Sequence, residues 1–295
     1  MDTTVLAFLA APCAASLILT GIHAYLGLHV VERGVIFVDL SLAQIAALGA
    51  TVAMLVPAFG GDPHGGPVYW LSLGFTFIGA AVFALVKGRR ARIPQEAIIG
   101  ISYAVASAAA ILVMSKSPTQ AEHLKDMLVG NILAVSWREV VHTSLLYGAV
   151  GTFHYVFRQR FLLISMDPDK ALAQGVPVRL WDFLFYVSFG FVVTSSVAIA
   201  GVLLVFCYLV VPSVAAMLYA DRVSSRLAIG WTMGTVVSLL GIYLSLFFDL
   251  PTGATIVCTF GLVLVLMAIA RPLLAPARPP AQSGPADTKV ASGVV

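Results

Sequence analysis

The feature of this sequence that most restricts its fold is a series of long, mainly apolar stretches separated by short polar segments. An α-helix needs about 20 mainly apolar residues to cross the hydrocarbon layer of a membrane. Nine stretches come close to that length. The sequence therefore predicts an all-α, multi-pass membrane protein with about nine transmembrane helices, near residues 4–26, 34–57, 68–86, 96–115, 140–157, 182–199, 201–219, 226–247 and 253–270.

The overall composition excludes most other classes of protein. Of 295 residues, 60% are hydrophobic and 11% are charged, whereas a soluble domain is about one quarter charged. The excess apolar surface must face lipid, which excludes a soluble enzyme, a disordered protein, a disulfide-stapled secreted domain and a nucleic-acid binder. Cys13, Cys207 and Cys258 lie in apolar stretches without a pairing pattern, so we expect buried thiols.

The distribution of positive charge predicts the orientation of the chain. Fourteen of the 17 Lys and Arg residues lie on one side of the nine predicted spans, and only Lys116, Lys125 and Arg138 lie on the other. The positive-inside rule makes the first side cytoplasmic. The N-terminus is then outside and the C-terminus inside, provided that two spans meet at Ala200-Gly201 with almost no loop.

The domain organisation follows from the same pattern. Residues 1–271 are predicted to form the transmembrane domain. Residues 272–295 are rich in Pro, Ala, Gly and Ser and are predicted to form a disordered cytoplasmic tail, because their apolar content is too low to offset the entropy of ordering.

Several catalytic and nucleotide-binding motifs are absent from the sequence. It has no Gly-x-x-x-x-Gly-Lys-Ser/Thr stretch, so the chain does not carry the loop that holds ATP phosphates. It also lacks His-Glu-x-x-His, Gly-x-Ser-x-Gly and Cys-x-x-Cys patterns. These absences argue against a membrane enzyme and favour a transport pathway or a subunit of one.

One cytoplasmic connection carries the signals of a short, sharply terminated helix. Asp167 suits an N-cap, and Pro168 suits the first helical position. Gly175 suits a left-handed C′ position at the other end. The segment is either an ordinary capped connection or a docking element for a cytoplasmic partner, with Ala171 and Leu172 placed mid-helix to meet that partner.

Polar residues inside the predicted spans are candidates for the transport path. An ionisable side chain at the bilayer centre costs roughly 2.5–3.5 kcal/mol on insertion scales, so its presence suggests a function. Asp39 lies inside the second span, with Ser41 and Gln44 after it, and His23 lies near the inner end of the first span. Asp39 either lines a translocation path or is a packing or hinge residue bonded to a neighbouring span.

Other polar residues near the membrane have simpler interpretations. We expect His29 and Glu32 to form an interfacial turn in which Arg33 is the pairing partner. A carboxylate favours a helix N-terminus, so Asp182 is predicted to be a helix cap. His154 is predicted to be a packing or interface residue rather than a metal ligand.

Four stretches together resemble a known family, the membrane permease subunits of ABC importers for divalent metals of the zinc, manganese and iron type. The similarity runs from about residue 8 to residue 270. The Gly-Asn-Ile-Leu-x-Val-Ser and Asp-Leu-Pro-Thr-Gly patterns are specific in combination. The four stretches are residues 37–49, 128–136, 167–177 and 249–256.

The resemblance implies a role for the capped helix and a set of partners. It implies that this helix couples the permease to separate ABC ATPase subunits. The other implied partners are an extracytoplasmic metal-binding protein and a second permease, either a copy of this chain or a paralogue. The implied location is the bacterial plasma (inner) membrane, with a divalent metal as cargo and no permanently bound cofactor. The coupling residues are Asp167, Pro168, Ala171, Leu172 and Gly175, and the outer loop that matches the family contains Asp249, Pro251 and Gly253.

The sequence departs from the family pattern at the expected metal ligands. The family places Gly-Asp-x-Leu-x-His here, with Asp and His four residues apart on one helical face. Val38 replaces the glycine, and Gln44 occupies the His position when the stretches are aligned on Gly49. Asp39 and Gln44 are five residues apart, so on a regular helix they point about 140° apart. Either oxygen ligands alone line the path, or Asp39 has a partner on another span. In both cases the sequence no longer implies that the transporter prefers zinc.

The sequence thus favours the permease subunit of an ATP-driven divalent-metal importer. An ion-coupled secondary transporter would also carry intramembrane Asp and His residues, but it has no need of a capped docking helix. A membrane scaffold without transport activity would explain the spans but not a buried Asp39.

Overall fold

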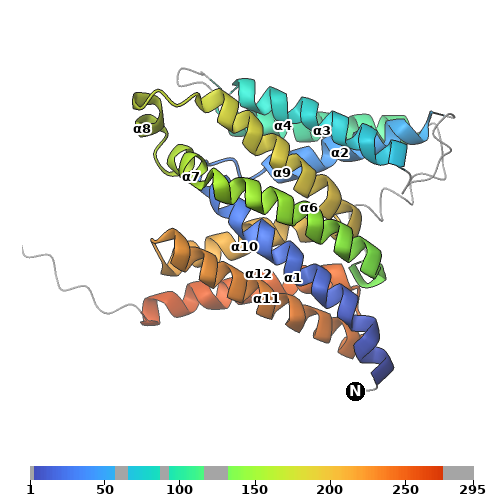
Figure 1. Ribbon diagram of the computed structural model, residues 1–295. Coiled ribbons are helices and arrows are strands. Elements are labelled where there is room, and N and C mark those ends of the chain that lie inside the picture. Colours follow the sequence, from blue (N-terminus) through green and yellow to red (C-terminus); the bar gives the residue numbers. More distant parts are fainter. Residues whose placement is uncertain (1–2, 57–65, 87–92, 116–131, 275–295) are drawn as a thin grey trace, which may run out of the picture.

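The chain folds into a bundle of helices, seen here in a computed structural model that describes residues 3–56, 66–86, 93–115 and 132–274 (Figure 1). Within these ranges all regular secondary structure is helical. The elements are α1 (Thr3–Glu32), α2 (Val38–Met54), α3 (Gly66–Val86), α4 (Gln95–Met114), η2 (Ile132–Ala134), α6 (Trp137–Val156), α7 (Arg158–Met166), α8 (Pro168–Ala173), α9 (Val178–Ala200), α10 (Val202–Tyr219), α11 (Val223–Phe248) and α12 (Thr252–Leu274).

A helix occupies each of the nine predicted spans, but only seven of the described helices are long and apolar enough to be candidate membrane spans. The other two are α2, which has 17 residues, and α6, which has 20. α6 is less apolar because it includes Arg138, Glu139, His142 and His154. The all-helical fold is confirmed, whereas the count of nine spans stays a prediction.

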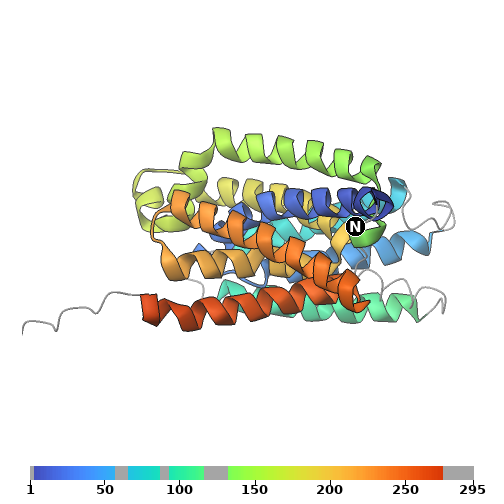
Figure 2. The same ribbon diagram turned by 90° about the horizontal axis from the view of Figure 1, so that it is seen from below.

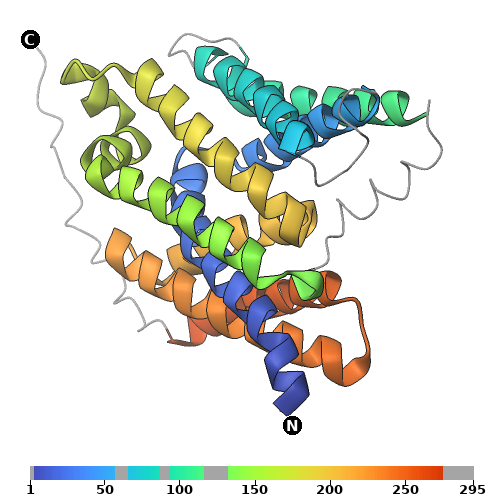
Figure 3. The ribbon, with the colours of Figure 1, turned by 45° about the vertical axis from the view of Figure 1, so that its right-hand side comes forward.

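The long helices pack in two groups. In one group α2 packs on α3 and α4, and α3 also packs on α9. In the other, α1 packs on α10 and α11, and α12 lies against α10 and α11. α6 runs alongside α1 and α9 and so contacts both groups (Figures 1 and 3).

The beginning of α1 and the end of α12 lie at opposite ends of the bundle. Figure 2 shows α8 at the same end as the last turn of α12, far from the N-terminus. α12 continues to Leu274, so the first three residues of the predicted tail belong to this helix. The rest of the predicted tail lies outside the described residues.

The break between α9 and α10 agrees with the prediction that two spans meet there. α9 ends at Ala200 and α10 begins at Val202. Gly201 between them has φ 76°, a left-handed conformation that glycine adopts without a steric penalty. A single glycine therefore turns the chain between two long helices.

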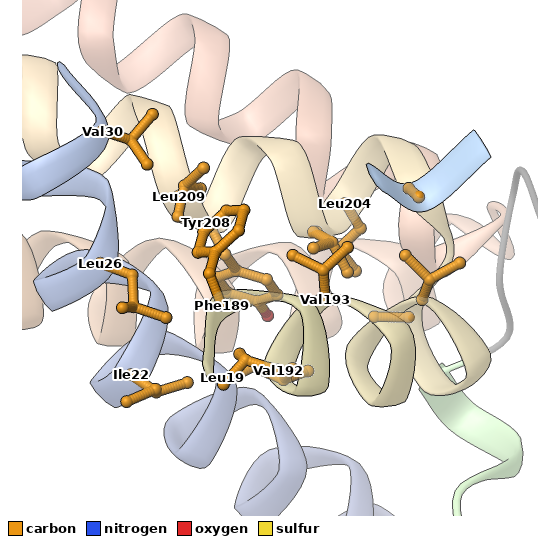
Figure 4. Close-up of a cluster of buried hydrophobic side chains, with 14 of the residues drawn as sticks. Leu19, Ile22, Leu26, Val30, Phe189, Val192, Val193, Leu204, Tyr208 and Leu209 are labelled. Carbon is orange, nitrogen blue, oxygen red and sulfur yellow. The ribbon is translucent and has the colours of Figure 1, made fainter. Parts of the chain in front are cut away.

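The core of the bundle lies where α1, α9 and α10 meet. Figure 4 shows side chains from these three helices pointing toward one another. The largest of them are fully buried: Leu19 and Leu26 from α1, Phe189 from α9, and Tyr208 and Leu209 from α10. Since lipid is as apolar as these side chains, helix association in a membrane depends on close packing and interhelical hydrogen bonds.

α1 and α10 approach each other closely at Gly27. A Cβ atom built on Gly27 would lie 1.9 Å from the Leu209 carbonyl oxygen and 2.5 Å from Ser213 Oγ. Ser213 Oγ–H also donates to the Ala24 carbonyl oxygen at 3.4 Å. Small residues at such crossings allow two backbones to touch.

We predict that Gly27→Ala lowers the free energy of unfolding by about 1–3 kcal/mol, because the added methyl group overpacks a backbone contact. Titration of the purified protein with a denaturing detergent measures this change. Gly21→Ala on the same helix is the matched control, since nothing lies within 4 Å of its Cβ position. Equal stability of the two variants would contradict the close α1–α10 crossing.

Candidate translocation and coupling sites

Asp39 is a buried carboxylate at the start of α2. The residue two positions earlier, Phe37, stacks on Phe206 of α10 with ring centroids 6.5 Å apart, so the start of α2 lies against α10. Asp39 is 1% exposed, and both of its carboxylate oxygens lack a hydrogen-bond partner among the described residues. Because buried polar groups are normally hydrogen-bonded, this carboxylate is chemically available to a cation.

A thiol on α10 lies in the neighbourhood of Asp39. Cys207 lies within electrostatic range of both Asp39 and Cys258. The prediction that all three cysteines are buried is wrong in detail: Cys13 and Cys207 are half-buried, and Cys258 is exposed on α12. The reason is that a lipid-facing thiol is as apolar as its surroundings, so an apolar stretch does not imply burial in protein.

The other candidates on α2 are buried as well. Ser41 and Gln44 are buried, and Ser41 Oγ has no hydrogen-bond partner among the described residues. α2 is an unbroken α-helix from Val38 to Met54, so Asp39 and Gln44 keep the divergent directions that their spacing predicts. The two side chains therefore do not form a ligand pair on one helical face.

His23 belongs to a different hydrogen-bonded group. Its Nδ1 lies 2.8 Å from the Leu19 carbonyl oxygen, and its Nε2 lies 3.2 Å from Ser196 Oγ on α9. Ser196 also bonds the Tyr147 hydroxyl on α6. Within the described part of the chain, no cluster of three or more His, Cys, Asp and Glu side chains could hold a metal. The structure thus does not bring His23 and Asp39 together.

The residues around Arg33 pair differently from the prediction. α1 continues through Glu32, so His29 and Glu32 are helical and not in a turn. Arg33 Nη1–H donates to Asp182 Oδ1 at 2.6 Å, and both side chains are almost completely buried. Asp182 is thus an ion-pair partner rather than a cap, while Glu32 pairs with Arg226 of α11.

His154 packs inside the bundle, as expected. Its Nε2 lies 2.8 Å from Ser188 Oγ on α9, and its ring stacks on Phe161 at 4.3 Å between centroids. His29 lies nearby and bonds Ser165 Oγ through Nδ1 at 2.8 Å. The two rings lie 6.5 Å apart between centroids. These contacts could not be predicted from the sequence, because no local pattern links helices so distant along the chain.

The capped helix forms as predicted. Asp167 accepts a hydrogen bond from the Lys170 backbone N–H at 3.0 Å, and Pro168 opens α8. Gly175 follows the helix with φ 70°. One prediction is wrong: Ala171 is buried against Ile164, because a helix this short uses one face to pack on its own chain.

The surface that α8 offers to a partner is therefore carried by Leu172. Its side chain is 44% exposed, whereas Ala171 is fully buried. α8 lies at one end of the bundle, outside the packed long helices (Figure 1). An exposed leucine on a helix held firmly by its neighbours is suited to contact another protein.

The turn between α11 and α12 is compact. Asp249 ends α11 with φ 53°, and Pro251 precedes α12, which contains Gly253 in its first turn. Ser245 Oγ–H lies 2.7 Å from the Leu250 carbonyl oxygen. The stretch 128–136, which also resembles the family, is described only from residue 132 onward. Its last residue, Ser136, forms a capping box with Glu139 at the start of α6.

The comparisons with known proteins agree on one family. Residues 6–271 match the ABC 3 transport family. The manganese transport system membrane protein MntC of Listeria innocua is 30% identical over 198 residues, which cover 64% of this chain and 69% of that protein. A probable iron transport system membrane protein of Haemophilus influenzae is 26% identical over 248 residues, 84% of each chain.

The fold is also similar to that of a solved structure. PsaBC from Streptococcus pneumoniae, solved in complex with Fab, superposes with a TM-score of 0.73 and 22% identity, covering 88% of this chain and 90% of that one. The arrangement of helices is therefore shared with a known structure. Because the family match spans nearly the whole membrane region, this chain belongs to the ABC 3 transport family.

Proposed function

We propose that this chain is the permease subunit of an ATP-driven importer of a divalent metal ion. The observation that carries the proposal is the family match over residues 6–271. Relatives named as manganese and iron transport proteins support a metal cargo. The chain itself supplies the membrane path, and separate subunits hydrolyse ATP.

Asp39 is the group through which we propose that the metal passes. Its two oxygens are buried and lack partners among the described residues, so they can receive a cation, whereas Ser41 and Gln44 point to other faces of α2. Carboxylate and carbonyl oxygens are ligands that suit Mn²⁺, whereas softer ligands such as thiolates favour zinc. We therefore favour manganese or ferrous iron over zinc as the cargo.

The permease needs only weak metal binding. A conducting site must bind well enough to admit the ion and weakly enough to release it. An isolated carboxylate without a second strong ligand on the same face meets that need. High affinity then belongs to an extracytoplasmic binding protein that delivers the metal to the outer mouth.

The proposed assembly places two permeases, either copies of this chain or paralogues, above two ATPase subunits in a bacterial inner membrane. Each permease crosses the membrane nine times, with the N-terminus outside and α8 in the cytoplasm. Closure of the ATPases on ATP moves α8 and changes the access of the path.

We predict that Asp39→Asn lowers metal uptake by about 10- to 100-fold, because the neutral amide loses the charge that attracts the cation, an effect of about 1.4 kcal/mol for each tenfold change. Uptake of radioactive Mn²⁺ into cells measures the change. Membrane levels of the protein and its association with the ATPase should stay normal. Normal uptake would contradict a role of Asp39 in the path. Reduced membrane levels of the folded protein would instead mean that Asp39 is a packing residue.

For α8 we predict opposite effects from two neighbouring substitutions. Leu172→Arg should leave stability within about 0.5 kcal/mol of wild type, as for other surface positions, yet abolish co-purification with the ATPase. Ala171→Arg should destabilise the chain itself by about 3 kcal/mol, because it places an unpaired charge in a buried contact. Thermal unfolding and affinity co-purification measure the two effects.

Two outcomes would contradict a coupling role for α8 or favour an ion-coupled secondary transporter. If Leu172→Arg keeps both the ATPase association and uptake, α8 is only a capped turn. Metal uptake that persists after removal of the ATPase subunit would instead support an ion-coupled secondary transporter.

A further inference from the structure

Arg33 is a buried cation that contacts both α7 and α9. Its Nε–H donates to Ser165 Oγ at 2.8 Å, and its Nη1–H donates to Asp182 Oδ1 at 2.6 Å. Its Cζ lies 4.0 Å from the centre of the Phe185 ring. The side chain is 1% exposed. We call Arg33, Ser165 and Asp182 the Arg33 link.

Two members of the Arg33 link are joined to α8. Ser165 lies at the end of α7, two residues before the Asp167 cap, and Asp182 lies in the second turn of α9. Between them, α8 is fixed by the contact of Ala171 with buried residues on both sides, Ile164 and Val176. A displacement of α8 therefore carries Ser165 and Asp182 with it.

The third member is joined to the helix that carries Asp39. Arg33 directly follows α1 and precedes Gly34, whose φ of 66° turns the chain. The Val35 N–H then donates to the Val30 carbonyl oxygen at 3.2 Å, which closes the turn. Asp39 follows six residues after Arg33, so the position of Arg33 sets where α2 begins.

The burial of the pair gives this connection its stiffness. A buried ion pair is costly to separate, because each charge would be left uncompensated in a medium of low polarity. Its guanidinium geometry also fixes direction, since planar donors bond two partners at set angles. The pair between Glu32 and Arg226 differs, because its side chains are 22% and 12% exposed and water can replace the contact.

We propose that Arg33 is a positioning residue that transmits movement of α8 to α2 and so couples ATP hydrolysis to the opening of the path at Asp39. This proposal rests on the proposed function, since it concerns the same transport cycle. Arg33 touches no metal in this scheme. It acts by moving the helix on which Asp39 is placed.

The test uses the complete transporter, with its ATPase and binding protein, in proteoliposomes supplied with Mn²⁺. Ser165→Ala removes the hydrogen-bond acceptor of Arg33 Nε–H, and Asp182→Asn removes the charge that pairs with the guanidinium. We expect ATP hydrolysis to stay within about twofold of wild type, whereas Mn²⁺ uptake per ATP falls about tenfold, a typical size for coupling between sites. Glu32→Gln is the matched control and should leave that ratio within about twofold of wild type.

A third variant keeps the test independent of folding. Arg33→Lys retains a charge to pair with Asp182, but its single ammonium cannot also bridge to Ser165 in the same geometry. We expect this variant to fold and to lose uptake per ATP as Ser165→Ala does. An unchanged ratio in all three variants would overturn the proposal, as would a parallel loss of ATP hydrolysis, uptake and thermal stability.

Failure of the proposed function would give a different result. If the wild-type complex takes up no Mn²⁺, the movement of α8 is measured as a distance instead. Spin labels are placed at Gln174→Cys, which is exposed at the end of α8, and at Leu55→Cys after α2, in a variant lacking the native cysteines. A distance change on ATP binding that disappears in Ser165→Ala would support the Arg33 link. A change that persists in Ser165→Ala would overturn it.

Discussion

The lack of hydrogen-bond partners in hydrocarbon is the constraint on which this structure depends. Polar groups within the bundle must find partners in the protein, and most of the buried ones do so through contacts between helices. His23 bonds Ser196, His154 bonds Ser188, and Arg33 bonds Asp182. Asp39 stands apart from the other buried carboxylates of the described residues, because neither of its oxygens has a hydrogen-bond partner. It is therefore the carboxylate to which we assign a passing cation in the proposed function.

The same constraint explains how α8 and the start of α2 are held relative to each other. Between helices in lipid there is little hydrophobic driving force, so their relative positions depend on close contacts and on a few buried polar pairs. The close contact at Gly27 holds α1 against α10. The pair of Arg33 with Asp182 holds the end of α1 against α9. Together they place the start of α2 relative to the segment that carries α8, which is the route by which we propose that movement of α8 reaches Asp39.

Much of the fold could be predicted from the sequence, because each prediction used a local signal. Apolar stretches marked the helices, Gly201 marked the sharp turn between two of them, and Asp167, Pro168 and Gly175 marked the ends of α8. The predictions that were wrong concerned contacts. The pairing of Arg33 with Asp182 joins residues 149 positions apart, and no local pattern selects one distant carboxylate over Glu32. The orientation of Ala171 was also hidden, since a six-residue helix is too short for periodicity to identify its buried face.

The central claim is that this chain forms the path for a divalent metal ion entering the cell. The most direct test is the metal content of cells grown under metal limitation, compared between a strain that lacks the gene, the parent strain and a complemented strain. The account predicts that manganese or iron falls several-fold in the deletion strain and returns with the wild-type copy. Equal manganese, iron and zinc contents in all three strains, with the protein present in the membrane of the parent, would contradict it.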